Sequence, residues 1–149
     1  MKISFYILFI TFFFINIVSA NENDYYLILK NNKVNVRYGP GFNYQIKYIY
    51  KKKNLPIKVI DKKENFRRII DFKKNSGWIH ISQLKKRKSI ILLKDQILFS
   101  KPTRYSKPII KIAKGRLLVV KKCKKIWCRV KTDNYLGWLK TDNIWGLIN

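Results

Sequence analysis

The segment NFRRIIDFKKNSGWIHISQL, residues 65–84, has a counterpart later in the chain, IWCRVKTDNYLGWLKTDNI, residues 126–144. In both segments a charged hairpin with turn-forming residues precedes a glycine-tryptophan pair, Gly77-Trp78 in the first and Gly137-Trp138 in the second. Self-similarity at a spacing of roughly sixty residues is typical of a duplicated structural unit. The sequence therefore predicts two units of one kind in tandem.

The hydrophobic pattern inside each unit has the period of a β-strand. Leu55, Ile57 and Val59 alternate with polar or turn residues, and residues 117–120 form a compact apolar run. Gly, Asn, Asp and Pro interrupt the chain at intervals of roughly eight to twelve residues, which is typical of an all-β barrel or sandwich. No segment has the pattern of an amphipathic helix. We expect each unit to be a small β-barrel or sandwich.

The glycine-tryptophan pairs fit the closure of such a barrel. Glycine lets the backbone bend at a corner, while an indole covers one end of the core. We assign Trp127 to the core or to a barrel end rather than to a ligand surface. Units of this size bury little surface alone, so contact between them and a disulfide are both expected to help. The residues with a predicted barrel-closing role are Gly77, Trp78, Gly137 and Trp138.

The first twenty residues have the pattern of a secretory signal peptide. Lys2 precedes an almost unbroken apolar run over residues 3–15, and Val18-Ser19-Ala20 supplies the small residues of a cleavage site. The apolar run is short for a membrane span, which needs about 20 residues, although an uncleaved N-terminal anchor is the alternative. We expect a signal peptide over residues 1–20, domains over 21–86 and 87–149, and a periplasmic or secreted protein.

The chain is strongly basic, with 33 Lys and Arg against 8 Asp and Glu and a formal net charge of +25. Such a charge favours binding to a polyanion: a nucleic acid, an anionic lipid surface or an acidic wall polymer. Export argues against nucleic acid and leaves electrostatic contact with a membrane surface open. A preference for A and T in the codons explains the abundance of Lys, Ile and Asn equally well, so both origins of the charge stay open.

Cys123 and Cys128 are the only cysteines and are separated by four residues. An even number of cysteines in an exported protein favours a disulfide, and these positions suit facing residues on two strands joined by a short hairpin loop. A metal site lacks further ligands because His80 is the single histidine. A thioredoxin-like redox site needs the spacing C-x-x-C. The sequence predicts a structural disulfide and no metal site.

No residue pattern points to catalysis. A Ser or Cys nucleophile needs a base such as histidine, and His80 matches Lys140 in the second copy, which favours an exposed position on a strand. Glycoside hydrolysis needs paired carboxylates, whereas the few acidic residues lie mostly in termini and turns. The Gly-Pro-Gly segment at residues 39–41 lacks the Lys-Ser/Thr continuation of a phosphate-binding loop. We expect a non-enzymatic protein without a cofactor.

Three segments resemble the bacterial SH3 domain. VNVRYGPGFNYQIKYI, residues 34–49, is similar to the opening of that domain, and GWIHISQL (77–84) and GWLKTDNIWG (137–146) are similar to its closing strand and final turn. CKKIWCRVKTDNYLGWLKTDNIWG, residues 123–146, resembles exported proteins of alphaproteobacterial type that carry two such domains in tandem. The resemblance covers nearly all of the predicted mature chain.

This resemblance implies a fold and a class of partner. The fold is all-β, with two tandem small SH3-like β-barrels after the cleaved signal peptide. The implied function is binding to the cell wall, with peptidoglycan, its peptide stems or another anionic envelope polymer as the ligand. A protein-protein interaction module that docks an envelope protein, through a barrel edge or the groove between the domains, is the alternative.

The segment around Gly39-Pro40-Gly41 is the candidate ligand loop. Aromatic rings beside such a loop can stack on a sugar or pack against a peptide, and the planar fork of an arginine can pair with a carboxylate. The second copy has Ser100-Lys101-Pro102 instead and lacks both glycines, so we favour the first copy as the binding copy. The alternative is that the tyrosines cover the seam between the domains. The candidate ligand residues are Arg37, Tyr38, Gly39, Gly41, Tyr44 and Tyr48.

Overall fold

The computed structural model describes residues 25–146, which form two seven-stranded antiparallel sheets. The predicted signal peptide lies outside the described residues. The first sheet contains β1 (Tyr25–Leu29), β2 (Val34–Arg37), β3 (Ile46–Tyr50), β4 (Pro56–Lys63), β5 (Phe66–Ile70), β6 (Ser76–His80) and β7 (Leu84–Lys85), with the 3-10 helix η1 (Ile81–Gln83) before β7. The second contains β8 (Ser89–Leu92), β9 (Gln96–Phe99), β10 (Pro108–Ile112), β11 (Leu117–Lys124), β12 (Trp127–Thr132), β13 (Tyr135–Lys140) and β14 (Ile144–Trp145).

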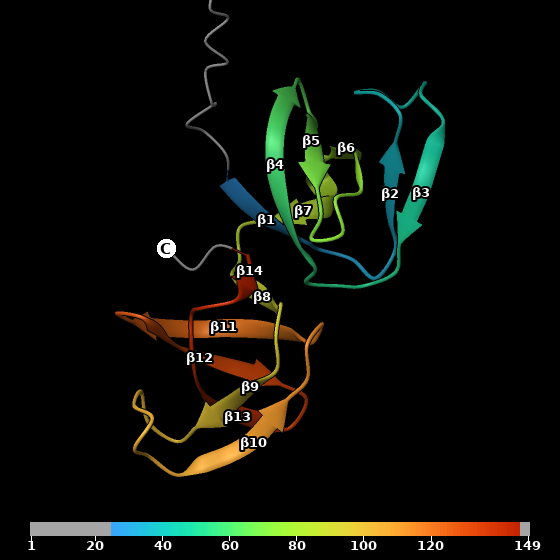
Figure 1. Cartoon of the computed structure of the whole chain (residues 1–149). Helices are drawn as coiled ribbons and strands as arrows, with labels where there is room; N and C mark the ends of the chain where they lie inside the picture. Colours follow the sequence, from blue (N-terminus) through green and yellow to red (C-terminus); the bar gives the residue numbers. More distant parts are fainter. Residues whose placement is uncertain (1–24, 147–149) are drawn as a thin grey trace, which may run out of the picture.

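The two sheets have the same topology. Their strand orders are β3-β2-β6-β5-β4-β1-β7 and β10-β9-β13-β12-β11-β8-β14, so every strand of the first has a counterpart seven places later. The registers agree as well, because Phe66 faces His80 across β5 and β6, and Trp127 faces Lys140 across β12 and β13. Figure 1 shows each sheet curled around its own interior, with one unit above the other. The predicted all-β fold of two tandem units of one kind is confirmed.

The strands turn at the positions that the sequence suggested. Lys74 and Asp133, which precede the two glycine-tryptophan pairs, have φ angles of 66° and 43°. This left-handed region is uncommon for non-glycine residues and occurs mainly in turns. A register shift between Val59 and Asp61 in β4, and another between Val120 and Lys122 in β11, mark a bulge at the same place in both sheets. Such bulges bend and twist a strand, which helps a short sheet to curl.

The glycines of the two pairs lie where each sheet curls back on itself. A Cβ atom at Gly77 would collide with the side chain of Val36 and lie 3.0 Å from the carbonyl oxygen of Arg37, both on β2. A Cβ at Gly137 would lie 2.9 Å from Ile109 Cδ1 and 3.0 Å from the carbonyl oxygen of Phe99. Any larger residue would push β6 away from β2, or β13 away from β9. Both glycines are therefore required for this close approach.

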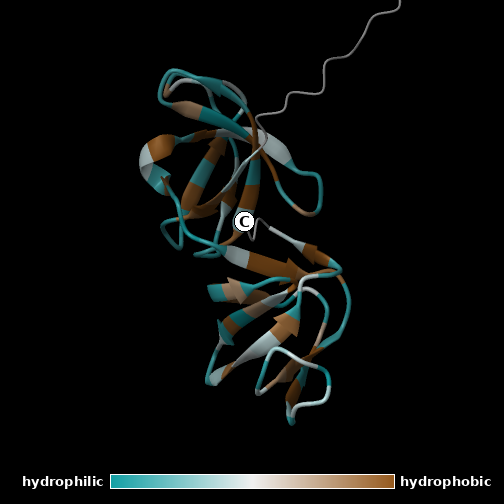
Figure 2. Cartoon of the chain, turned by 90° about the vertical axis from the view of Figure 1, so that its left-hand side faces the viewer, coloured by the Kyte–Doolittle hydropathy of each residue, from teal (hydrophilic) through white to brown (hydrophobic). Residues whose placement is uncertain are grey.

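Strand β8 is buried along its whole length and joins the two cores. Ile90 and Leu92 belong to the core of the second domain, whereas Ile91, which lies between them, belongs to the core of the first. Leu117 and Trp145 of the second domain also pack against the first core. Because alternate residues of a strand point to opposite faces, one strand contributes to both hydrophobic cores. Figure 2 shows this apolar strand at the junction.

Two hydrogen bonds and a ring contact reinforce the junction. The hydroxyl of buried Ser89 donates to the carbonyl oxygen of Asn54 at 2.6 Å, and Nε1 of Trp145 donates to the carbonyl oxygen of Pro56 at 3.2 Å. The rings of Trp145 and Tyr26 meet edge to face, with centroids 5.5 Å apart. The polar groups of the junction are thus satisfied as the surface around them is buried. We expect the two domains to behave as one folding unit.

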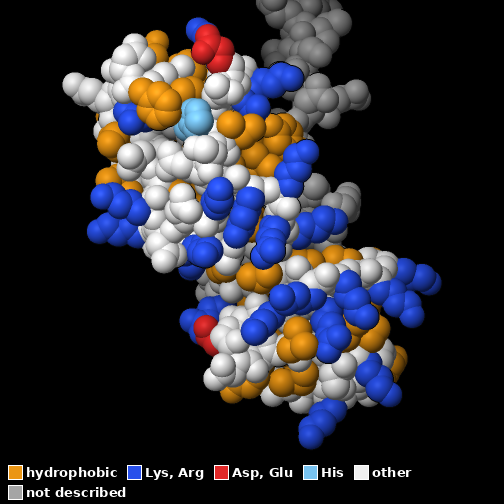
Figure 3. All heavy atoms as spheres, turned by 180° about the vertical axis from the view of Figure 1, so that it is seen from behind, with side chains coloured by type: hydrophobic (Ala, Val, Ile, Leu, Met, Phe, Trp, Pro, Cys, Tyr) orange, Lys and Arg blue, Asp and Glu red, His pale blue; other side chains and the backbone are white. Residues whose placement is uncertain are grey.

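The Lys and Arg side chains lie on the outside of both domains, whereas Asp71 is buried. Figure 3 shows Lys and Arg side chains gathered where the two domains meet and over the second domain, with few acidic side chains on this face. Within residues 25–146, no helix is long and apolar enough to cross a membrane.

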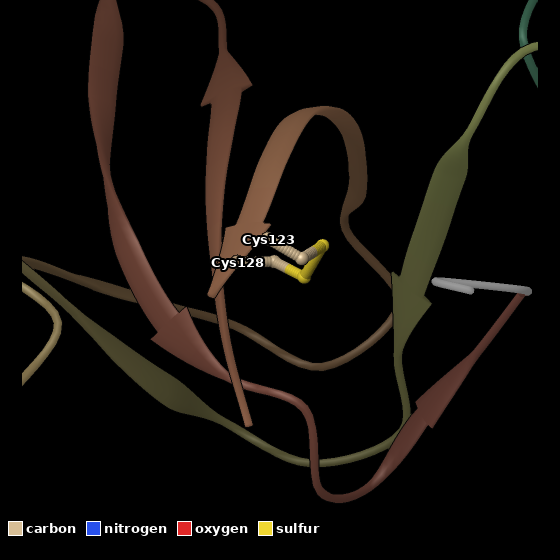
Figure 4. The surroundings of a disulfide bond; sticks show 2 residues. All are labelled: Cys123 and Cys128. Atoms are coloured by element: carbon tan, nitrogen blue, oxygen red, sulfur yellow. A yellow bond between two sulfur atoms is a disulfide. The ribbon is translucent and has the colours of Figure 1, made fainter. Parts of the chain in front are cut away.

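The predicted disulfide is present. Cys123 and Cys128 are bonded and lie directly opposite each other on β11 and β12, with Cα atoms 4.1 Å apart (Figure 4). Cys128 is fully buried in the second core, while Cys123 is exposed on the outer strand. The bond therefore fixes an exposed hairpin to the core of the second domain. Closing so short a loop stabilises the folded state by about 2 kcal/mol in the chain-entropy model.

We predict that Ile91→Ala destabilises both domains. The substitution removes an apolar side chain from the first core and leaves a cavity, which costs about 2–5 kcal/mol. Urea unfolding measures the loss, and amide hydrogen exchange at β5 and β12 locates it. Ile90→Ala is the matched control, because the same side chain one residue earlier points into the second core. If Ile91→Ala leaves the protection of β5 unchanged, the cores are not coupled through β8.

We also predict that the two cysteines tolerate serine unequally. Cys123→Ser breaks the disulfide at an exposed position and costs about 2 kcal/mol. Cys128→Ser breaks the same bond and also places a hydroxyl in the second core, which adds about 1–3 kcal/mol. Urea unfolding of both variants under reducing and oxidising conditions measures the difference. Equal losses for the two variants would contradict the buried position of Cys128.

Candidate functional site

The candidate ligand loop has the same backbone structure in both domains. It spans residues 38–45 between β2 and β3, and residues 100–107 between β9 and β10. Three backbone hydrogen bonds of the first loop recur in the second at matching positions, with the following donor and acceptor atoms. In the first loop they run from Tyr38 N to Gln45 O (3.1 Å), from Gly41 N to Gly39 O (3.0 Å) and from Tyr44 N to Gly41 O (3.4 Å). In the second loop, in the same order, they run from Ser100 N to Lys107 O (3.0 Å), from Thr103 N to Lys101 O (2.8 Å) and from Ser106 N to Thr103 O (3.4 Å).

The Tyr44 ring lies against Gly39 and close to Gly41. Neither is among the glycines with a positive φ angle, which within the described residues are Gly115 and Gly146. A Cβ atom at Gly39 would collide with the ring of Tyr44, whereas one at Gly41 would first meet the side-chain oxygen of Asn43 and would lie 3.3 Å from the Tyr44 ring. The glycines therefore make room for an aromatic ring that folds over the loop.

The second loop has no glycine because the residue at the position of Tyr44 has a smaller side chain. Ser106 takes the place of Tyr44, and its hydroxyl donates to the carbonyl oxygens of Lys101 and Thr103 at 3.1 and 2.9 Å. With no ring over the loop, Lys101 and Thr103 fit where the first copy has Gly39 and Gly41. The same backbone is thus held by a tyrosine ring in one domain and by a serine hydroxyl in the other.

Arg37 holds the first loop in place from the end of β2. Its Nη1 atom donates to the carbonyl oxygens of Phe42 and Tyr44 at 3.2 and 2.6 Å. Its guanidinium carbon lies 5.4 Å from the centre of the Phe42 ring, within the range of a cation–π contact. Part of the fork that the sequence suggested for a carboxylate ligand is therefore engaged by the loop itself.

Phe42 closes the first loop over β5 and β6. Its ring centre lies 5.3 Å from that of Phe66 and 5.0 Å from that of His80, and the latter two are 5.1 Å apart. Phe42 remains 66% exposed, whereas Phe66 is buried. His80 Nδ1 lies 2.7 Å from the hydroxyl of Ser82. The cluster of Arg37, Phe42, Phe66 and His80 thus covers the space beside the loop.

Two of the predicted tyrosines lie in different surroundings. Tyr38 is 64% exposed, and Lys47 Nζ lies 5.7 Å from the centre of its ring. Tyr48 is half-buried against the first core, with its hydroxyl 3.3 Å from that of Tyr50, which donates to Asp71 at 2.9 Å. Burial raises the pKa of Tyr48 above its ordinary value, although its hydrogen bond with Tyr50 acts in the opposite direction. Tyr38 offers an open ring, whereas Tyr48 is tied into a structural network; the ligand roles stay predictions.

The second domain has different side chains at the four cluster positions. Phe99 occupies the place of Arg37, because each faces the tryptophan of its domain's glycine-tryptophan pair. Arg104 is the fifth residue after β9, as Phe42 is the fifth after β2. Trp127 and Lys140 replace Phe66 and His80. The ring centres of Phe99 and Trp127 are 5.9 Å apart and their planes are nearly perpendicular, at 85°.

The swap of an arginine and a phenylalanine between strand and loop was not predicted from the sequence. The contacts that it changes join a loop to two strands that are distant in the chain. The aligned repeat carried the signal, since aromatic and cationic residues change places between positions 37 and 42 of the first copy and positions 99 and 104 of the second. Residues 25–146 contain no cluster of three or more His, Cys, Asp or Glu side chains that would hold a metal ion.

We predict that Gly39→Ala destabilises the first domain and that Tyr44→Ser relieves the loss. The new methyl group collides with the Tyr44 ring, and overpacking of this kind costs about 1–3 kcal/mol. The double variant copies the solution of the second loop. Thermal unfolding of the single and double variants measures the effect. Lys101→Ala is the matched control and is expected to change stability by less than about 0.5 kcal/mol; no rescue by Tyr44→Ser would contradict the role of the ring.

Comparison with solved structures finds partial similarity to three proteins, each at low sequence identity. NlpC2 from Trichomonas vaginalis is 14% identical with a TM-score of 0.38, and covers 82% of this chain and 48% of its own. NlpC1 from the same organism is 13% identical with a TM-score of 0.39, covering 85% and 47%. An NlpC/P60 family protein from Bacillus cereus is 12% identical with a TM-score of 0.37, covering 83% and 56%. The chain thus spans about half the length of these proteins. Comparison with curated protein sequences finds no match.

Comparison with family models identifies the two units directly. The model described as "Bacterial SH3 domain" matches residues 30–86 and, separately, residues 94–146. The first match spans β2 to β7 and the second spans β9 to β14. Together the matches cover most of the chain and reproduce the repeat seen in the sequence and in the topology. The chain belongs to the bacterial SH3 domain family and carries two copies of the domain in tandem.

Proposed function

We propose that this protein is a non-enzymatic binding module of the bacterial cell envelope, and that it holds an anionic wall polymer, with peptidoglycan as the first candidate. The observation that carries the proposal is a group of four cations at the junction of the two domains, which we call the seam cluster. Its members are Lys30, Lys53, Lys85 and Arg87. In the described part of the chain, none of their side chains has an ion pair or a hydrogen bond.

The members of the seam cluster act on one another electrostatically. Burial, followed by the charges of Arg87, Lys53 and Lys30, lowers the pKa of Lys85. Cations that repel one another in this way are stabilised when an anion neutralises them. A polymer with negative charges at regular intervals would contact several members at once. Because exposed charges are screened over about 8 Å at physiological salt, this attraction depends on ionic strength.

The location of the protein is part of the proposal. Residues 1–20 have the pattern of a signal peptide, so we place the protein in the periplasm or outside the cell. In that compartment the available polyanions are wall polymers and lipid surfaces rather than nucleic acids.

A second candidate function is docking of an envelope protein. Strand β3 lies at one edge of the first sheet and exposes two isoleucines, Ile46 and Ile49, which are 44% and 38% exposed. An edge strand with apolar side chains can pair with an extended segment of another protein. The two candidates differ in what captures the protein from the cell envelope.

We predict that the protein pellets with purified sacculi at low salt and that the seam cluster supplies much of the binding. Lys85→Gln combined with Arg87→Gln lowers the affinity by roughly tenfold, because two unpaired cations are lost from the contact. Lys62→Gln combined with Lys131→Gln is the matched control, since it removes the same charge from exposed strand positions elsewhere. Retention is measured from about 50 mM to about 500 mM salt.

The outcomes separate the two candidate functions. Retention that falls with salt, and falls more in the seam variant than in the control, supports binding of an anionic polymer. Equal losses in both variants mean that only net charge matters. No retention at any salt, together with crosslinking of one protein partner in envelope extract, rejects polymer binding in favour of docking. Retention that vanishes at moderate salt and survives Tyr38→Ala argues against a specific site at the first loop.

A further inference from the structure

The second domain has a hollow beside its loop, at the place where Phe42 covers the first domain. Its volume is about 430 Å³. Phe99 and Trp127 form an aromatic corner on one side, and Arg104, Lys94, Lys111 and Lys140 also line it. Lys94 lies in the turn between β8 and β9, and the others belong to β9, the β9–β10 loop, β10, β12 and β13. Strands β9 and β10 lie on the side of the second domain away from the first (Figure 1).

The hollow follows from the exchange of side chains between the two copies. In the first domain the Phe42 ring packs on Phe66 and His80. In the second domain the equivalent loop residue is Arg104, and the aromatic ring has moved to Phe99 on the strand. Because the backbone hydrogen bonds of the two loops match, the difference comes from the side chains and not from a different loop path. The second copy therefore leaves open the space that the first copy fills.

The cations of the hollow are mostly without partners. In the described residues, the side chains of Lys94, Arg104 and Lys140 have no hydrogen bond and no ion pair. Lys111 pairs with Asp95 at 3.1 Å, and Asp95 also accepts a hydrogen bond from the backbone N–H of Lys114 at 2.9 Å.

These contacts, the backbone N–H first and Lys111 second, lower the pKa of Asp95, so its carboxylate is already engaged. Asp142 is the other acidic residue of the lining. Positive charge therefore exceeds negative charge around an aromatic corner, which suits a ligand with an anionic group on an apolar or ring-shaped body.

We propose that this hollow is the specific binding site of the protein and that it takes a carboxylate carried by a sugar-peptide unit of peptidoglycan. Arg104 pairs with the carboxylate through its planar fork, Lys140 adds a second positive contact, and the corner of Phe99 and Trp127 packs against the sugar ring or the aliphatic part of the peptide. The inference rests on the proposed function and places the specific site in the second copy, whereas the sequence favoured the first.

The test uses the whole protein and a soluble probe, the monomeric disaccharide-peptide that a muramidase releases from sacculi. Binding is measured by calorimetry and by tryptophan fluorescence. We expect Arg104→Gln to weaken binding at least about tenfold, as loss of a charge-assisted contact does, and Lys140→Gln to weaken it several-fold. Arg104→Phe, which copies the residue of the first loop, is expected to fill the hollow and abolish binding.

Two controls make the result specific. Lys62→Gln removes one positive charge from an exposed position on β4, outside the seam cluster and the hollow, and is expected to change affinity for the soluble probe by less than about twofold. Phe42→Ala alters the equivalent loop position of the first domain and is expected to leave the affinity for the probe unchanged. Far-UV circular dichroism and melting curves of the Arg104 variants, at an exposed position, check that they fold.

The outcomes distinguish the site from the general function. If the unmodified protein pellets with sacculi but does not bind the probe, or if Arg104→Gln and Lys62→Gln weaken binding equally, the site is rejected and the proposed function stands. If neither sacculi nor the probe bind, the proposed function fails and the site fails with it. Binding of the free disaccharide or of the free peptide, when sensitive to Arg104→Gln, supports the site and identifies which part carries the carboxylate.

Discussion

Strand β8 is the element on which the arrangement of the whole molecule depends. Its Ile90 and Leu92 belong to one core and its Ile91 to the other, so neither domain completes its interior without it. Domains of about sixty residues bury a limited fraction of their surface, and a shared strand gives each a larger core than it would have alone. We therefore expect the two loops, the seam cluster and the hollow to keep fixed positions relative to one another, so that a ligand contacting both domains meets one surface instead of two tethered modules.

The two copies use one loop backbone for different purposes. In the first, the Tyr44 ring folds over the loop, the glycines make room for it, and Arg37 fastens the loop to β2. In the second, the hydroxyl of Ser106 bonds carbonyl oxygens within the loop, and this serine stands where the first loop has the Tyr44 ring. Arginine and phenylalanine have changed places between strand and loop. In the first arrangement Arg37 and Phe42 make internal contacts, whereas in the second the side chains of Arg104 and Lys140 have no hydrogen bond or ion pair within the described residues.

Local features of this fold could be predicted from the sequence, and long-range contacts could not. The hairpins, the glycine-tryptophan pairs and the disulfide involve residues that are close in the chain, so spacing and turn chemistry were sufficient for them. The double role of β8 was not predicted, although the apolar run of residues 90–93 without alternation is typical of a strand buried on both faces. The packing of Phe42 on Phe66 and His80 joins residues from three elements, and nothing in a single copy indicates it. Only the comparison of the two copies showed that Arg37 and Phe42 correspond to Phe99 and Arg104.

The same comparison bears on the origin of the positive charge. A codon preference that enriches lysine places it wherever the surface tolerates it, and it predicts the same bias at equivalent positions of both copies. The four positions around the loop do not follow that rule. On the strands, Trp127 and Lys140 of the second copy replace Phe66 and His80 of the first. In the loop, Arg104 of the second copy replaces the Phe42 ring of the first. General basicity attracts polyanions over a distance of about a Debye length, whereas discrimination among them requires contact with a shaped site. On our proposals the seam cluster serves the first requirement, and the open corner of the second domain serves the second.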